Sequence, residues 1–296
     1  MGYLHTLRWV TGHPLTHAKP VSAISRYIRW QFGSRILKQK VIYPWVNDTR
    51  LVVGLGDTGL TGNIYCGLHE FEDMSFILHA LRATDCFVDV GANCGSYTVL
   101  AAGAVGCRTI SIEPVPNTFT RLLDNVYLNR IETNVKCLNI GVGANDANLK
   151  FSSDLDTVNH VLTEQESTQE CIIVPMKSLN SQLTASGRMI IKIDVEGYET
   201  NVIRGASEVM KSENVDAVVM ELNGSGLRYG FDDDALHKSM LYFGFVPCRY
   251  SPLERKMEQL SGINRSGGNT IYVKNFEFVE QRVKSAAAFE ILGRQI

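Results

Sequence analysis

Apolar runs and amphipathic stretches alternate along residues 70–275, which is the pattern of an α/β fold. Five short apolar runs predict the strands of a sheet: 87–90, 109–113, 135–142, 189–194 and 215–221. Between these runs, apolar residues recur at helical spacing, most clearly at Phe119, Leu122, Leu123 and Val126. Strands that alternate with helices predict a mostly parallel sheet.

The pattern changes toward both ends of the chain. Two final strands, near 245–250 and 269–274, flank a polar loop and predict an antiparallel end to a sheet of seven strands. We therefore expect three parts: a basic extension with a glycine-rich hairpin over 1–69, a central domain over 70–275, and a tail over 276–296 that is predicted to be helical.

The N-terminal residues combine basic and aromatic side chains. A second amphipathic pattern predicts a helix between arginines: Ile24, Tyr27, Ile28, Phe32 and Ile36. Residues 1–50 carry eight Lys or Arg and one acid, so their charge is +7 and the rest of the chain sums to −9. One interpretation is a solvated helix that packs one face on the main domain. The other is a basic helix that rests on an anionic surface, such as membrane lipid or a lipid-linked glycan.

Residues 50–67 contain a second glycine pattern. Gly54-x-Gly56-x-x-Gly59 follows a strand-like run, as in dinucleotide-binding folds, but that interpretation requires a helix to begin there. The next residues include Gly62 and Gly67 and show no helical period. A glycine-rich β-hairpin or flap is therefore the predicted structure.

Composition sets limits on the class of protein. The hydrophobic share of 45%, the charged share of 20% and the net charge of −2 give no general argument for binding nucleic acid or lipid. Seven cysteines are never spaced Cys-x-x-Cys, so we expect reduced thiols and a cytoplasmic protein. No apolar run approaches the roughly 20 residues of a membrane span, and we expect no signal peptide.

A glycine-spaced turn after the first predicted strand indicates a nucleoside-binding edge. It reads Asp89-x-Gly91-Ala92-Asn93-x-Gly95, which differs from the turn of a dinucleotide binder. An acid in this strand would repel a pyrophosphate, because both groups carry negative charge. The motif suits a cofactor that lacks phosphate and has a cationic end, as S-adenosylmethionine does. We expect the turn to approach the cofactor's carboxylate and ribose, and Asp89 to bind its ammonium group or orient the loop.

Acidic and polar residues also end the next three strands, at the edge where open α/β sheets bind ligands. Glu113 is expected to accept hydrogen bonds from both ribose hydroxyls, and Asn139 and Ile140 are expected to border the adenine. Asp194 ends the fourth strand and is expected to face the transferred methyl group. Because the acids of 194–199 precede a helix, helix capping is an equal interpretation of this segment.

These motifs resemble the FkbM family of S-adenosylmethionine-dependent O-methyltransferases. The resemblance is carried by 88–95, by 111–114 and above all by Lys192-Ile193-Asp194-Val195-Glu196-Gly197-Tyr198-Glu199. It implies a Rossmann-like class I methyltransferase fold over roughly 70–275, and methylation of hydroxyls that are often on sugars of glycans, glycolipids or glycosylated metabolites. The chain departs from the family in having Ser178-Leu179-Asn180 where Thr-Leu-Asp is common.

A sugar hydroxyl needs a base that takes its proton as the new bond forms. The candidates are Asp194, His160 and Glu221 at the end of the fifth strand. His160 has the best intrinsic pKa for this task, but a loop histidine with no special role is an equal interpretation. Glu221 can instead bind a sugar hydroxyl. Carboxylates at two strand ends are too common to predict a metal site, and we expect none.

Two other functions stay open at this point. A nicotinamide-dependent reductase or epimerase would use the Gly54 segment as its nucleotide turn. A non-catalytic module would keep the fold and lose turnover, although Asp89, Gly91, Glu113 and Asp194 are all in place.

Overall fold

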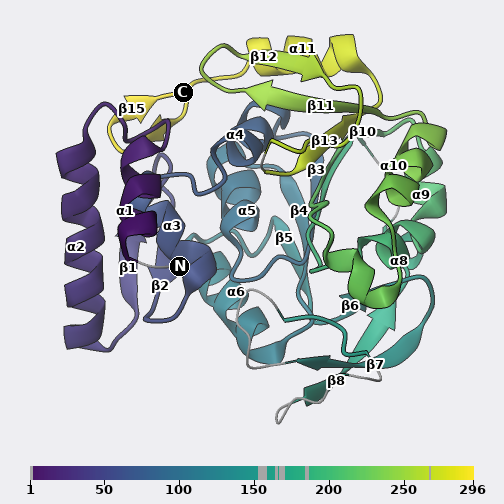
Figure 1. Cartoon of the computed structure of the whole chain (residues 1–296), viewed down its shortest axis with the longest axis horizontal. Helices are drawn as coiled ribbons and strands as arrows, with labels where there is room; N and C mark the ends of the chain where they lie inside the picture. Colours follow the sequence, from purple (N-terminus) through teal and green to yellow (C-terminus); the bar gives the residue numbers. More distant parts are fainter. Residues whose placement is uncertain (1–2, 153–158, 164–165, 167–170, 184–186, 267) are drawn as a thin grey trace.

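The centre of the molecule is a twisted sheet of eight strands in the order β12-β11-β13-β10-β9-β3-β4-β5 (Figure 1). The computed structural model describes residues 3–152, 159–163, 166, 171–183, 187–266 and 268–296. Five strands are parallel: β3 (Cys86–Val90), β4 (Arg108–Ile112), β5 (Val135–Leu138), β9 (Met189–Ile193) and β10 (Val215–Met220). Every residue of β3, β9 and β10 is buried, because both faces of the sheet are covered.

The last strands confirm the antiparallel end of the sheet. β13 (Thr270–Val273) lies antiparallel between β10 and β11 (Val246–Ser251). β12 (Lys256–Gln259) adds an eighth strand at the edge beside β11, where the sequence predicted only a polar loop. Together these features confirm the predicted Rossmann-like α/β fold class.

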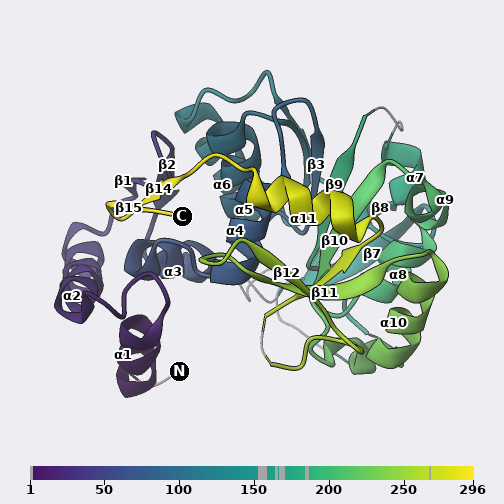
Figure 2. The same cartoon turned by 90° about the horizontal axis from the view of Figure 1, so that it is seen from above.

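Helices cover both faces of the sheet (Figure 2). One face carries α4 (Phe71–Ala80), α5 (Ser96–Thr98), the π-helical turns Val99–Val105 and α6 (Pro116–Leu128). The other carries α7 (Leu179–Gln182), α8 (Glu199–Arg204), α9 (Ser207–Lys211) and α10 (Asp233–Tyr242). The side chains of β3 alternate between these layers: Phe87 joins the first core, and Val88 and Val90 join the second.

The direction of strand order reverses at β3. From there β4 and β5 extend the sheet one way, while β9 and β10 extend it the other way. Val90 pairs with Ile193 in parallel register, so the carboxyl ends of β3 and β9 lie side by side. Open α/β sheets bind ligands at this reversal point. A separate sheet, β6-β8-β7, lies at the bottom of the view in Figure 1 and consists of Gly141–Val142, Cys171–Lys177 and Ala147–Ser152.

The N-terminal part corrects the hairpin predicted over 50–67. β2 (Arg50–Val53) does form a hairpin, but with the upstream β1 (Val41–Pro44), and Thr58–Cys66 is helix α3. Six of the nine α3 residues are buried, and they include Gly62 and Asn63, so buried positions lie all round the helix and its apolar residues show no 3.6-residue period. Because β2 belongs to a two-stranded antiparallel sheet, the Gly54 pattern is not the strand–turn–helix unit of a dinucleotide fold.

The two ends of the chain lie together. After α11 (Phe276–Lys284), the tail turns into the hairpin β14 (Glu290–Ile291) and β15 (Arg294–Gln295), so only its first half is the predicted helix. Asn47 N donates to Glu290 O at 3.0 Å, and Glu290 N donates to Asn47 Oδ1 at 2.8 Å. Arg294 also donates to Leu15 O near the start of α2 (Pro20–Leu37), which follows α1 (Tyr3–Gly12). Within the described residues, no helix is long and apolar enough to cross a membrane.

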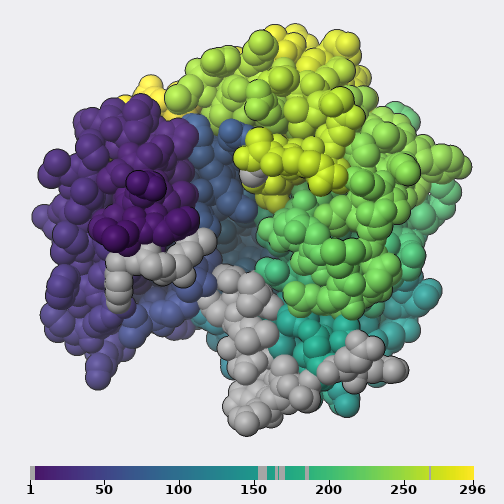
Figure 3. All heavy atoms as spheres, in the orientation of Figure 1, coloured from purple at the N-terminus to yellow at the C-terminus, as the bar shows by residue number. Residues whose placement is uncertain are grey.

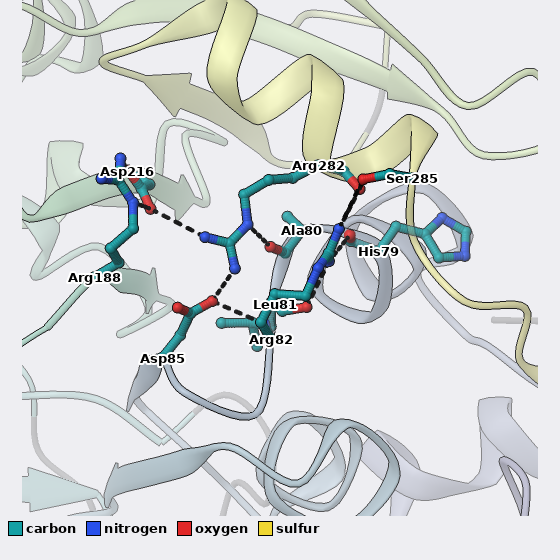
Figure 4. Close-up of polar contacts among 9 residues, drawn as sticks. All are labelled: His79, Ala80, Leu81, Arg82, Asp85, Arg188, Asp216, Arg282 and Ser285. Atoms are coloured by element: carbon teal, nitrogen blue, oxygen red, sulfur yellow. Dashed lines mark hydrogen bonds and ion pairs between the residues drawn. The ribbon is translucent and has the colours of Figure 1, made fainter.

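A network of ion pairs joins the amino ends of the strands (Figure 4). Arg282 of α11 pairs with Asp85, which precedes β3, and its Nη1 lies 3.9 Å from Asp216 Oδ2 in β10. Arg188, which precedes β9, donates from Nε to the same Asp216 oxygen at 2.8 Å. Arg282 Nε also donates to Ala80 O at the end of α4 at 2.7 Å. The network therefore holds three strands and two helices in place.

Candidate active site

A cavity of about 290 Å³ opens at the carboxyl ends of β3, β9 and β10. Its residues come from three places: the turn after β3, the ends of β9 and β10, and the N-terminal part. Figure 3 shows the corresponding hollow between the N-terminal residues in purple and the later residues in green. The cavity thus lies at the reversal point of the sheet, where the sequence predicted the cofactor.

The turn after β3 has a backbone that only glycine permits at Gly91. Its φ is +81°, and a Cβ there would lie 1.8 Å from Asp194 O, so any side chain would overlap the neighbouring strand end. Gly91 N and Ala92 N both donate to Ile112 O, at 3.0 and 2.9 Å. Gly91, Ala92 and Asn93 line the cavity, and Gly95 closes the turn beneath them with φ +86°. The predicted turn residues are therefore together at the cavity wall.

Asp89 lies beneath this turn with one carboxylate oxygen partnered and the other alone. Oδ2 accepts a hydrogen bond from Thr98 Oγ1 at 2.8 Å. Among the residues that the structure describes, no hydrogen-bond partner reaches Oδ1, although the side chain is 1% exposed. Burial raises the pKa of Asp89, and Lys192 opposes that rise. A buried, unpartnered carboxylate oxygen at a cavity fits the ammonium group of a cationic ligand.

Glu113, at the end of β4, braces the turn. Its Oε2 accepts from Asn93 N at 3.0 Å and its Oε1 accepts from Val115 N at 2.9 Å. Burial raises its pKa to about 7. Asn139 donates to Glu113 O and Pro114 O, and Ile140 is half-buried beside it. Glu113, Asn139 and Ile140, which the sequence predicted to bind ribose and adenine, thus lie together at the ends of β4 and β5, next to the cavity lining. The hydrogen bond from Asn93 N links Glu113 to that lining.

Lys192 is a buried cation that lines the cavity, one residue before the end of β9. Its Nζ lies 2.7 Å from Asp194 Oδ2 and 4.7 Å from the centre of the Tyr97 ring. Burial alone lowers the pKa of Lys192, but the carboxylates of Asp194, Glu70 and Asp89 outweigh it and raise the pKa. Sequence reasoning missed this residue, because a single Lys in an apolar strand gives no sign of which carboxylates surround it.

Three carboxylates stand together on one side of the cavity. Asp194, Glu196 and Glu221 each place one oxygen within 4.8 Å of the others. Burial and then the charge of Asp194 raise the pKa of Glu196 to about 7 and that of Glu221 to about 8. Such spacing can hold a divalent cation, although acidic clusters of this kind are common without one.

Glu199 has a structural role in the same segment. Its Oε1 accepts hydrogen bonds from Val195 N at 3.1 Å and Gly197 N at 3.2 Å, which fixes the loop before α8. The structure therefore separates the acids of this segment. Asp194 and Glu196 face the cavity, while Glu199 satisfies backbone donors near the helix start.

His160 lies apart from the other two proposed bases. It is 7% exposed beside the bridge between Val161 and Phe151, and its Nε2 is 3.3 Å from Glu166 Oε1. Among the described residues, the cavity lining includes Asp194 and Glu221 but not His160. Residues 153–158, shortly before His160 in the chain, lie outside the described ranges.

The N-terminal part supplies a wall that sequence reasoning missed. Thr58, Gly59 and Leu60 of α3 line the cavity, together with His69 and Glu70 before α4. Glu70 Oε2 accepts a hydrogen bond from Tyr97 OH at 2.8 Å, which connects this wall to α5, the helix that follows the glycine turn. The His69 ring packs edge-on against Trp9 at 5.2 Å. The one signal in the sequence was a His-Glu pair placed just before the helix that leads into the first strand.

The family model of the methyltransferase FkbM domain matches residues 89–247. A curated relative, the hexuronic acid methyltransferase AglP of Haloferax volcanii, is 26% identical over 158 residues. This match covers 52% of the present chain and 62% of AglP, so the chain spans less than two thirds of that relative's length.

Solved structures with a similar arrangement share little sequence with the chain. The precorrin-6y C5,15-methyltransferase of Geobacter metallireducens is 14% identical and has a TM-score of 0.38, with 69% of this chain and 87% of that one covered. The precorrin 8w decarboxylase of Methanobacterium thermoautotrophicum is 11% identical with a TM-score of 0.39, and 69% and 88% of the two chains are covered.

Proposed function

Because the chain belongs to the FkbM methyltransferase domain family, we propose that it transfers a methyl group from S-adenosylmethionine to a hydroxyl group of a sugar. One observation carries the proposal. The cavity combines an unpartnered buried oxygen of Asp89 beneath a glycine turn with a group of carboxylates that have raised pKa values. The first feature suits a cationic cofactor, and the second suits a hydroxyl that must lose its proton.

Residues of the turn would hold the cofactor. Asp89 Oδ1 would accept from its ammonium group, and the Gly91–Asn93 backbone would approach its carboxylate and ribose. Both oxygens of Glu113 already accept a backbone N–H, but each keeps a further lone pair for a ribose hydroxyl. Asn139 and Ile140 would border the adenine. S-adenosylmethionine, when bound, supplies a methyl group that is already activated on a sulfonium sulfur.

Glu221 is the base that we favour for the acceptor hydroxyl. A base works best when its pKa lies near the working pH, and the pKa of Glu221 is raised to about 8. Asp194 is held by Lys192 in an ion pair, which suits it to orient the acceptor rather than to take a proton. His160 remains a sequence-based prediction, and His69 is a further imidazole that lines the cavity.

A sugar acceptor is supported by the relative and by the cavity wall. AglP is a methyltransferase of hexuronic acid, which is a sugar. In the present chain, Glu70, Glu196 and Glu221 offer several carboxylate oxygens that can accept hydrogen bonds from neighbouring hydroxyls. The specific sugar and the position methylated are left to experiment.

Calorimetric titration tests the cofactor. The protein should bind S-adenosylhomocysteine, and Asp89→Asn should weaken that binding, while the exposed Asp146→Asn should leave it unchanged. Binding of NADH in place of S-adenosylhomocysteine would support the nicotinamide-dependent rival instead.

A transfer assay with labelled methyl donor tests the reaction. Hexuronic acid glycosides and neutral hexosides should become labelled on oxygen, which NMR of the product would show. Label that enters only amine or thiol acceptors would contradict methylation of hydroxyls. Cofactor binding without transfer to any acceptor would favour the non-catalytic module.

A further inference from the structure

Helix α2 exposes a stripe of large apolar side chains on the face opposite its packing face. Ala23 and Tyr27 are buried, and the Tyr27 ring packs edge-on against Tyr65 of α3, within the N-terminal part. Val21 is 79% exposed, Ile28 47%, Phe32 67% and Ile36 76%. At roughly 100° per residue these four fall within a narrow arc, so they form one continuous stripe.

Unneutralised positive charge accompanies the stripe. Residues 1–40 contain seven Lys or Arg and no Asp or Glu. Arg29 and Arg35 are exposed and border the stripe, and Arg35 donates to Gln31 rather than to an acid. Within the described ranges, no carboxylate forms an ion pair with Arg29, Arg35 or Lys38, which ends the helix.

The position of α2 leaves this face accessible. Both cartoon views place the helix at the outer edge of the molecule, beyond α1 and α3. Ile28, Phe32 and Arg35 also line a groove, together with Tyr27 and Gln31. The stripe and its flanking arginines are therefore free to meet a flat partner.

We propose that α2 docks on the surface of an anionic phospholipid bilayer. Ile28, Phe32 and Ile36 would enter the boundary between headgroups and acyl chains, while Arg29 and Arg35 contact phosphates. A second copy of the chain suits this face less well. A symmetric dimer through α2 would bring two arginine-flanked stripes together, with no acid from residues 1–40 to neutralise them.

Vesicle flotation of the full chain tests this surface. Vesicles with about 30% phosphatidylserine should float the protein, pure phosphatidylcholine vesicles should float much less, and added salt should weaken binding. The triple variant I28S/F32S/I36S should lower the partition coefficient about tenfold or more. The variant R29E/R35E should lose the preference for anionic lipid, by on the order of fivefold for each arginine.

A matched control comes from exposed apolar residues elsewhere. Leu227, Tyr242 and Leu253 are 73%, 85% and 64% exposed, and L227S/Y242S/L253S should bind vesicles like the wild type. Circular dichroism checks that each variant is folded. Equal flotation of the wild type and I28S/F32S/I36S would overturn the proposal. The proposal would also be overturned if the wild type did not bind vesicles but formed a dimer that I28S/F32S/I36S disrupts. Neither outcome depends on methyl transfer, because no cofactor or acceptor is present.

Discussion

Two groups of charged side chains lie at opposite ends of the same strands, and they differ in how completely their charges are paired. At the amino ends, the carboxylates of Asp85 and Asp216 meet Arg188 and Arg282 (Figure 4). At the carboxyl ends, Lys192 forms an ion pair with Asp194, while Glu196 and Glu221 stand beside that pair.

The difference separates a structural cluster from a candidate functional one. A buried carboxylate that is paired and hydrogen-bonded holds neighbouring elements together. At the carboxyl ends, burial and then the negative charge of Asp194 raise the pKa values of Glu196 and Glu221. Burial also raises the pKa of Asp216, but two arginines oppose that rise. Buried acids that lie beside other acids are concentrated at active sites. Because both clusters lie on one sheet, changes in each can be compared directly within the same fold.

The largest expected effect is on turnover, at the carboxyl ends. Glu221→Gln keeps the size of the side chain and removes the proposed base. We expect methyl transfer to fall about 10²–10⁴-fold with little change in S-adenosylhomocysteine affinity. Glu258→Gln, at an exposed position on β12, is the control and should keep wild-type turnover. Full activity of Glu221→Gln would remove it from the role of base.

The next effect is on stability, at the amino ends. Arg282→Met leaves Asp85 without its main partner, and we expect the free energy of unfolding to fall by about 3–5 kcal/mol. Arg249→Met breaks the exposed pair with Glu258 and should cost about 1 kcal/mol or less. Urea titration measures both. If Arg282→Met lowered the turnover of the folded fraction while leaving stability unchanged, the assignment of a structural role to the amino-end cluster would be wrong.

Glu113 sharpens the comparison, because it lies at the carboxyl ends but both of its carboxylate oxygens accept hydrogen bonds from backbone N–H groups. If it binds ribose, Glu113→Ala should weaken S-adenosylhomocysteine binding about tenfold or more, as expected for hydrogen bonds to a charged group. Asp146→Ala, which removes an exposed carboxylate that pairs with Lys177 away from the cavity lining, serves as the control. Unchanged cofactor affinity with lowered stability would assign Glu113 to bracing the turn.

The smallest effect is the pH dependence of stability. The pKa of Glu221 is raised from 4.5 to about 8, so the folded chain holds this proton more tightly than the unfolded chain. The resulting stability is complete below about pH 4.5 and is lost as the pH rises through about 8. Glu221→Gln should therefore be more stable than the wild type at pH 8.5, by about 1 kcal/mol after allowance for solvent. Equal melting temperatures of the two proteins at pH 8.5 would contradict the raised pKa.

Much of the fold could be predicted, because each central strand corresponds to a short apolar run in the sequence. The glycine turn was also visible, since Gly91 and Gly95 need positive φ. Helix α3 was missed because it is buried on nearly all sides and its side chains show no period. Periodicity reports one-sided burial, so it cannot reveal an element that is enclosed.

Residues of the candidate site could be predicted only where they lie at or next to the carboxyl end of a predicted strand. Asp89 and Asp194 follow from strand polarity. The wall formed by His69 and Glu70 depends on how the N-terminal part folds back over the sheet, which no local pattern encodes. The same limit explains His160, whose loop is attached to the separate sheet β6-β8-β7 rather than to the strand ends.

The hydrogen bonds between Asn47 and Glu290 of the C-terminal hairpin constrain the order in which the chain can fold during synthesis. Residues 3–66 leave the ribosome before the residues near 290 that form part of their packing surface. Until the residues around Phe289 and Ile296 emerge, the nascent N-terminal part lacks these contacts. The N-terminal wall of the cavity therefore gains its full set of contacts only after the central sheet has been translated.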